Sequence, residues 1–132
     1  MQTSWEPFTG GPYMRQPHTF VRVTLCTKKT LYLSKPAYEA LGKPRAVELL
    51  FNEQLNAIGV RPTSLTRESA FPVRERYKGG KPYGYRIQAA AFMRHYNIVP
   101  DVMIQFNKIT VDSEGLMMLP LAFITRVGRT KA

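Results

Sequence analysis

The sequence feature that most constrains the fold is an internal repeat. Residues 47–52 (VELLFN) align with residues 102–107 (VMIQFN), and both carry apolar side chains in alternation before an aromatic residue and an asparagine. Each segment is followed by a polar turn and by a second apolar run that ends in proline. Apolar runs of this kind on either side of a short turn predict a β-hairpin. The sequence therefore predicts one hairpin in each half, with turns at residues 53–56 and 112–115.

A short helix is predicted before each hairpin. Residues 35–41 follow Ser34, a favourable N-cap, and stop before Gly42, which suits the left-handed position after the last turn. In the second copy, residues 89–96 stop before Asn97, which stands where Gly42 stood. Residues 31–34 and 85–88 are predicted strands directly before the helices, and a further strand leads into each of them. Each half therefore has the predicted order β–β–α–β–β.

This order defines the expected fold class. One copy alone would bury too little apolar surface, so two copies are expected to pack together across a pseudo-twofold axis. We expect an α+β, β-rich fold in which two ββαββ repeats form a small β-barrel, because closure removes exposed sheet edges. An open two-layer arrangement is the alternative.

With 132 residues, the chain is expected to form a single domain. The leading strands of the two copies are predicted at residues 20–26 and 71–77. The expected organisation is an N-terminal arm (1–18), repeat 1 (19–62), a connector (63–70), repeat 2 (71–120) and a basic C-terminal tail (121–132).

The net charge of +10 indicates an anionic partner, with nucleic acid as the first choice. Nine of the ten excess positive charges lie outside residues 30–62 and 83–120, in the leading segments, the connector and the tail. This distribution suits phosphate contacts along duplex DNA. The residues expected to contact DNA are Arg22, Lys28, Lys29, Arg74, Arg76, Lys78, Lys81, Arg126, Arg129 and Lys131.

Two basic turns are central to this expectation. Under a twofold axis, the turn at residues 28–29 and the turn at residues 78–81 would be symmetry mates. Arg22 and Arg74 would be related in the same way, and Arg76 shares a strand face with Arg74. The competing interpretation of residues 78–81 is an ordinary hairpin turn with solvated lysines.

Residues 27–35 (TKKTLYLSK), the sequence ALG at residues 40–42 and the hairpin ending at Pro62 resemble the unit of AbrB-type swapped-hairpin transcription factors. Two such units in one chain resemble the tandem arrangement of the MraZ relatives, although the second copy matches weakly. The resemblance implies a cradle-like barrel, transcription regulation and DNA binding by basic residues near the hairpin turns. The sequence departs from the pattern at residues 43–46, where the family has a glycine–acidic pair, and at Ser34, where it has proline.

A different class of function stays open. The protein could be a non-enzymatic module that binds a cellular protein through a barrel edge or through its aromatic N-terminal arm, which carries Trp5, Phe8 and Tyr13. Tyrosines interleaved with basic residues could also stack single-stranded bases, although tyrosines in strands more often pack against neighbours. The residues in this second pattern are Tyr77, Tyr83 and Tyr85, with Lys78, Lys81 and Arg86.

Other functions are not expected. The single cysteine, Cys26, excludes an intrachain disulfide and a thiolate metal cluster, and we expect no metal and no cofactor. The acidic residues are scattered without a paired nucleophile and base, so we expect no enzyme. No segment has the roughly 20 apolar residues of a membrane helix, and the N-terminus lacks a signal-peptide pattern. We expect a soluble cytoplasmic protein, and a homodimer is compatible with the sequence.

Overall fold

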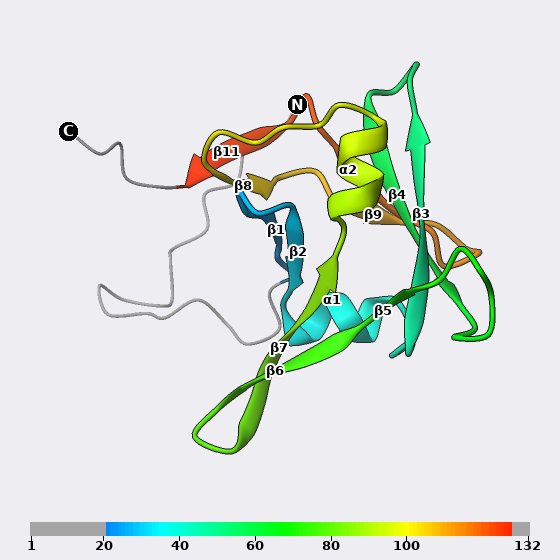
Figure 1. The fold of residues 1–132 in the computed structure, drawn as a ribbon, viewed down its shortest axis with the longest axis vertical. Helices are drawn as coiled ribbons and strands as arrows, with labels where there is room; N and C mark the ends of the chain where they lie inside the picture. The colour runs from blue at the N-terminus through cyan, green and yellow to red at the C-terminus, as the bar shows by residue number, and fades with distance from the viewer. Residues whose placement is uncertain (1–20, 128–132) are drawn as a thin grey trace, which may run out of the picture.

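The computed structural model describes residues 21–127, which form two antiparallel sheets and two short helices (Figure 1). The predicted β-rich class is confirmed. In chain order, the elements are β1 (Val23–Leu25), β2 (Thr30–Leu33), α1 (Lys35–Ala40), β3 (Ala46–Asn52), β4 (Ala57–Thr63), β5 (Phe71–Pro72), β6 (Arg74–Lys78), β7 (Lys81–Gln88), α2 (Ala90–His95), β8 (Met103–Phe106), β9 (Thr110–Val111), β10 (Met117–Pro120) and β11 (Ile124–Val127).

The strands form two open sheets. The six-stranded sheet has the order β11-β8-β1-β2-β7-β6, and the five-stranded sheet has the order β5-β3-β4-β10-β9. Each sheet therefore ends in two edge strands, and within residues 21–127 no ladder of hydrogen bonds closes a barrel. This arrangement corresponds to the open alternative rather than to the closed barrel.

The core contains side chains from both sheets and both helices. In β1 and β2 the buried residues alternate with more exposed ones, so that one face of each strand joins the core. Ala37 of α1 and Met93 of α2 are completely buried beside them. The largest fully buried side chains are Leu25, Leu31, Ile58, Ile87, Met93, Met117, Leu119, Val23, Val47 and Val60.

Both helices lie where the sequence predicts them. The Ser34 hydroxyl accepts a hydrogen bond from the Ala37 N–H at 3.3 Å, which confirms the predicted N-cap of α1. Gly42 follows the helix with a φ of 86°, and Asn97 follows α2 with a φ of 59°. Each helix has only six residues, and no helix in the described part of the chain is long and apolar enough to cross a membrane.

The second predicted hairpin pairs differently from the first. In the first half, β3 and β4 form a continuous hairpin around residues 53–56. In the second half, the turn at residues 112–115 forms as predicted, but it joins the short β9 to β10. The prediction that residues 102–107 pair with β10 is wrong, because β8 pairs with β1 and β11 in the other sheet. The chain crosses from one sheet to the other within residues 107–109, between β8 and β9.

Part of the predicted basic tail is a strand. Residues 124–127 form β11, which pairs with β8 along its whole length. Ile124 packs against the core from this edge. The apolar residues that begin the predicted tail therefore belong to the folded domain.

Candidate nucleic-acid interface

One face of the six-stranded sheet points away from the core. The strand registers place Thr24, Tyr32, Arg86 and Arg74 in one row across β1, β2, β7 and β6. The leucines on either side of Tyr32 are buried, and neighbouring residues of a strand point to opposite faces, so this row points outward.

Positive charges gather on this outward face and on the hairpin that extends it. Arg74 lies directly opposite Arg86, and Lys78 lies directly opposite Lys81. Like charges at directly opposite positions destabilise a sheet, so the sequence retains an unfavourable arrangement that a bound anion would relieve. We call the following set the basic face: Arg22, Arg74, Arg76, Lys78, Lys81 and Arg86.

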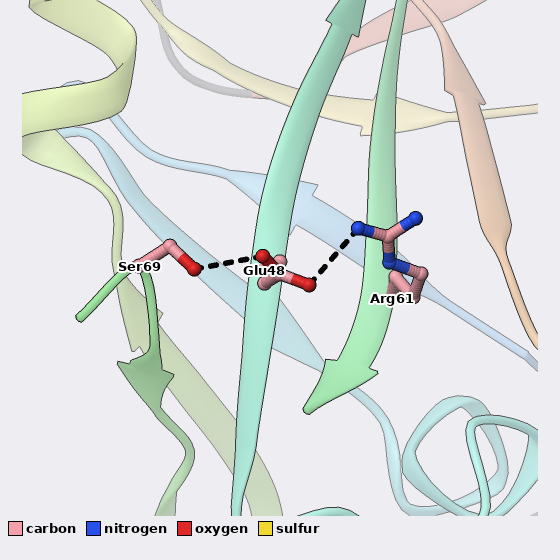
Figure 2. Close-up of polar contacts among 3 residues, drawn as sticks. All are labelled: Glu48, Arg61 and Ser69. Carbon is pink, nitrogen blue, oxygen red and sulfur yellow. Dashed lines mark hydrogen bonds and ion pairs between the residues drawn. The ribbon is translucent and has the colours of Figure 1, made fainter. Parts of the chain in front are cut away.

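In the five-stranded sheet, by contrast, the arginine is paired with a carboxylate. Arg61 of β4 donates a hydrogen bond to Glu48 at 3.0 Å, and the Ser69 hydroxyl donates to the other oxygen of Glu48 at 2.7 Å (Figure 2). The hydrogen bonds from Ser69 and Arg61 lower the pKa of Glu48. Between described residues, the salt bridges are Arg61–Glu48 and Arg126–Asp101, and neither includes Arg74, Arg76 or Arg86.

Arg76 is held over two aromatic rings. Its guanidinium carbon lies 4.1 Å from the ring centroid of Tyr32 and 4.8 Å from that of Tyr83. Its side chain passes Gly84, where an added Cβ would lie 3.9 Å from the Arg76 Cδ and 3.1 Å from the carbonyl oxygen of Leu33. The close approach of the Leu33 carbonyl, and not the position of Arg76, is therefore what favours glycine here. A stacked guanidinium retains its planar fork of N–H donors, which matches a phosphate.

Tyr32 presents a neutral ring to this arginine. Burial raises the pKa of Tyr32, as do the charge of Cys26 and a hydrogen bond with it, and the positive charges of Arg76 and Arg86 offset only part of this increase. Near neutral pH the contact is therefore a cation–π interaction rather than an ion pair with a phenolate.

Two open hollows lie beside Arg76 on the outward face. The larger has a volume of about 470 Å³, and its lining includes Arg22, Thr24 and Gln105. The smaller, about 360 Å³, is lined by Glu75 and Arg86 among others. Arg76, Tyr32 and Tyr83 line both hollows. The lining of the larger hollow also includes Leu33, Met103 and Val127, so the face is uneven and combines polar with apolar side chains.

The structure does not bring the two basic turns together. The turn that carries Lys28 and Lys29 lies at the Gln88 end of β7, where the Lys29 carbonyl accepts a hydrogen bond from the Ala89 N–H at 3.1 Å. The turn between Lys78 and Lys81 lies at the other end of the same strand. At about 3.3 Å per residue, the two turns are roughly 25 Å apart. Lys28 and Lys29 therefore lie far from Lys78 and Lys81, at the end of β7 that is closer to Arg86.

Arg126, the basic residue of the predicted tail that the structure describes, is not part of this surface either. Arg126 is in register with Ile104, whose side chain points into the core, and it forms a salt bridge with Asp101 at 2.7 Å. Arg129 and Lys131 lie outside the described residues, as does the aromatic N-terminal arm.

The three tyrosines of the predicted stacking pattern have different surroundings. Tyr85 stacks on Tyr38 of α1, with ring centroids 3.7 Å apart, so it has a packing role. Tyr77 is 60% exposed and Tyr83 is 49% exposed, both near the end of the β6–β7 hairpin. The Tyr77 hydroxyl donates a hydrogen bond to Glu75 at 2.6 Å, which raises the pKa of Tyr77. Only two of the three rings could therefore meet a ligand.

Two members of the site were not selected for duplex contact from the sequence. The sequence pattern predicts for Arg86 only a place among the tyrosines that could stack on single-stranded bases, and it predicts no binding role for Tyr32. Alternation could have placed both on an outward face, since each lies between inward-pointing residues. Their position beside Arg74 and Arg76, however, depends on the pairing of β2 with β7.

Within residues 21–127, no group of three or more histidine, cysteine, aspartate or glutamate side chains is placed to hold a metal ion. No protein-family model, curated protein or solved structure matches the chain.

Proposed function

We propose that the protein binds duplex DNA through the basic face and acts as a transcriptional regulator. The observation that carries the proposal is the placement of Arg74 directly opposite Arg86, with Arg76 two residues further along β6. Three guanidinium groups then project from two neighbouring strands, with Glu75 as an acidic residue in the lining of the adjacent hollow. Phosphates spaced along a DNA backbone would neutralise charges that repel one another in the free protein.

The regulatory part of the proposal depends on the AbrB-type resemblance. It is supported by the way in which the two halves of the chain interleave, since β2 pairs with β7 and β4 pairs with β10. A duplicated ββαββ unit would produce such pairings around a pseudo-twofold axis, and we propose that the chain arose by such a duplication. The different partners of β8 and β3 would then be a later divergence.

The proposal is tested by measuring the affinity for a labelled duplex over a range of salt concentrations. Each phosphate contact contributes about 0.9 to the slope of log affinity against log salt, so six contacts predict a slope near −5. The triple variant R74Q/R76Q/R86Q should lose about 2.7 from the magnitude of this slope and should bind more weakly at every salt concentration.

A matched variant controls for net charge. R61Q/R67Q/R94Q also changes the net charge from +10 to +7, but its residues lie on the five-stranded sheet, in the connector and on α2. This control should keep most of the wild-type affinity. Equal losses in the two triple variants, or a wild-type slope near zero, would refute the assignment of the basic face.

The same measurement separates duplex binding from binding of single strands. A single-stranded oligonucleotide has a smaller slope per contact, about 0.7, and relies on base stacking for affinity. We expect the duplex to bind more tightly than either of its strands. Tighter binding of the single strand would favour stacking on Tyr77 and Tyr83 instead.

The protein-binding alternative has a separate test. If the protein is purified from a lysate treated with nuclease, we expect bound nucleic acid to be lost and no protein to remain at a fixed stoichiometry. A stoichiometric protein partner that survives nuclease would favour the alternative.

A further inference from the structure

The end of the β6–β7 hairpin is a two-stranded ribbon that extends beyond the sheet. β7 pairs with β2 only along Tyr85–Gln88, whereas β6 stays paired with β7 out to Lys78 and Lys81. Beyond Gly84, each strand therefore has a single neighbour. Figure 1 shows this hairpin projecting away from the rest of the molecule. Both of its faces are open, as the exposure of Tyr77 and Tyr83 indicates.

The dimensions of the ribbon match one groove of DNA. The two strands of a ribbon lie about 4.8 Å apart. Together with the side chains on its faces, a sheet is about 10 Å thick. The major groove of B-DNA is about 12 Å wide and admits a two-stranded ribbon, whereas the minor groove is only about 6 Å wide. Residues 76–78 extend roughly 10 Å, which is similar to the major-groove depth of about 8.5 Å.

We propose that the tip of the β6–β7 hairpin enters the major groove of duplex DNA. This inference rests on the proposed function and specifies how the basic face would dock. With the tip inserted, Arg74, Arg76 and Arg86 would lie at the base of the ribbon, beside the phosphate backbones that flank the groove.

The tip has the residues that such an insertion needs. Gly79 and Gly80 have φ values of 62° and 80°, which suit a tight type I′ turn and keep the tip free of side chains. An added Cβ at either position would meet nothing within 4 Å, so packing inside the protein does not require these glycines. Lys78 and Lys81 flank the turn and can donate hydrogen bonds to guanine N7 and O6, which face the major groove.

The basic turn at residues 28–29 can be compared with this tip. Lys28 and Lys29 also follow a strand, but their turn is hydrogen-bonded to the residue that precedes α2. It does not project as a free ribbon. We therefore expect the preference for the major groove over the minor groove to depend on the β6–β7 tip and not on this turn.

The test compares two duplexes of the same sequence, one plain and one with glucosylated 5-hydroxymethylcytosine, which fills the major groove. Wild-type protein should bind the glucosylated duplex about tenfold or more weakly. Netropsin, which occupies the minor groove, should leave binding unchanged. K78Q/K81Q should bind plain duplex more weakly and should discriminate less between the two duplexes, while K28Q/K29Q should discriminate like the wild type.

The outcomes distinguish this inference from the function on which it rests. If the protein binds both duplexes equally, or if netropsin competes, major-groove insertion is wrong although DNA binding stands. Unchanged discrimination in K78Q/K81Q would also overturn the role of the tip, provided that the urea midpoint of the variant equals that of the wild type. Failure to bind the plain duplex at all would refute the proposed function itself.

Discussion

The guanidinium carbon of Arg76 lies 4.1 Å from the ring centroid of Tyr32, although a whole strand, β7, separates the strands that carry them. The side chain of Arg76 crosses β7 at Gly84, where an added Cβ would be in ordinary contact with Arg76 but crowded against the carbonyl oxygen of Leu33. The result is an arginine that lies over an aromatic ring and forms no salt bridge with a described carboxylate. Its charge is oriented without being neutralised.

Replacing Tyr32 tests this orientation. Tyr32→Leu should weaken duplex binding about two- to fivefold, because a cation–π contact at an exposed site contributes about 0.5–1 kcal/mol. Tyr32→Phe retains the ring and should bind like the wild type. Fluorescence anisotropy at one fixed salt concentration measures both variants. Equal losses in Tyr32→Leu and Tyr32→Phe would point to the hydroxyl instead of the ring.

Arg76→Lys separates the charge of this residue from its shape. Lysine keeps the positive charge but lacks the planar fork that stacks on a ring and binds phosphate at two points. We expect weaker binding with an unchanged slope of log affinity against log salt. A change in the slope would mean that the variant loses a phosphate contact altogether.

The cap of α1 also ties the helix to the sheet. The Ser34 hydroxyl accepts hydrogen bonds from the Ala37 N–H at 3.3 Å and from the Arg22 N–H at 2.9 Å. Ser34→Ala should lower the free energy of unfolding by about 1 kcal/mol, measured by urea denaturation. Ser34→Thr retains an oxygen at this position and should recover most of the loss. Identical urea midpoints for wild type and Ser34→Ala would show that the cap contributes little.

Glu48 should make the stability depend on pH in the acid range. Its pKa is lowered in the folded protein by the Ser69 hydroxyl and by Arg61, so the unfolded chain binds the proton more readily. The stabilisation is complete above the ordinary glutamate pKa of about 4.3, and it is lost as the pH falls through the lower pKa of the folded state.

The variant Glu48→Gln tests whether Glu48 causes this dependence of stability on pH. Urea midpoints between about pH 6 and pH 3 should fall less steeply in the variant than in the wild type. Some dependence on pH should remain, because the hydrogen bond from Arg126 also lowers the pKa of Asp101. Parallel curves for variant and wild type would contradict the role of Glu48.

Local features of the fold were predictable because they depend on residues close together in the chain. The Ser34 cap, the left-handed residues Gly42 and Asn97 and the Gly79–Gly80 turn all follow from intrinsic backbone preferences. The alternation of buried residues in β2 is equally local.

Pairings between distant strands were less predictable. The apolar pattern of residues 102–107 indicates a strand, but it is compatible with either sheet, and only three-dimensional packing selects β1 as the partner of β8. For the same reason, the separation of Lys28 and Lys29 from Lys78 and Lys81 could not be deduced from their charge. The charges of these residues can be read from the sequence, but their grouping in space cannot.

The position of β1 has a consequence for the order in which the chain can assemble. One neighbour of β1 is β2, which follows it directly, but the other is β8, which is synthesised much later. Until residues 103–106 have left the ribosome, one side of β1 remains an unpaired edge. Contacts over such a distance along the chain slow folding, so the centre of the six-stranded sheet should be among the last parts to form.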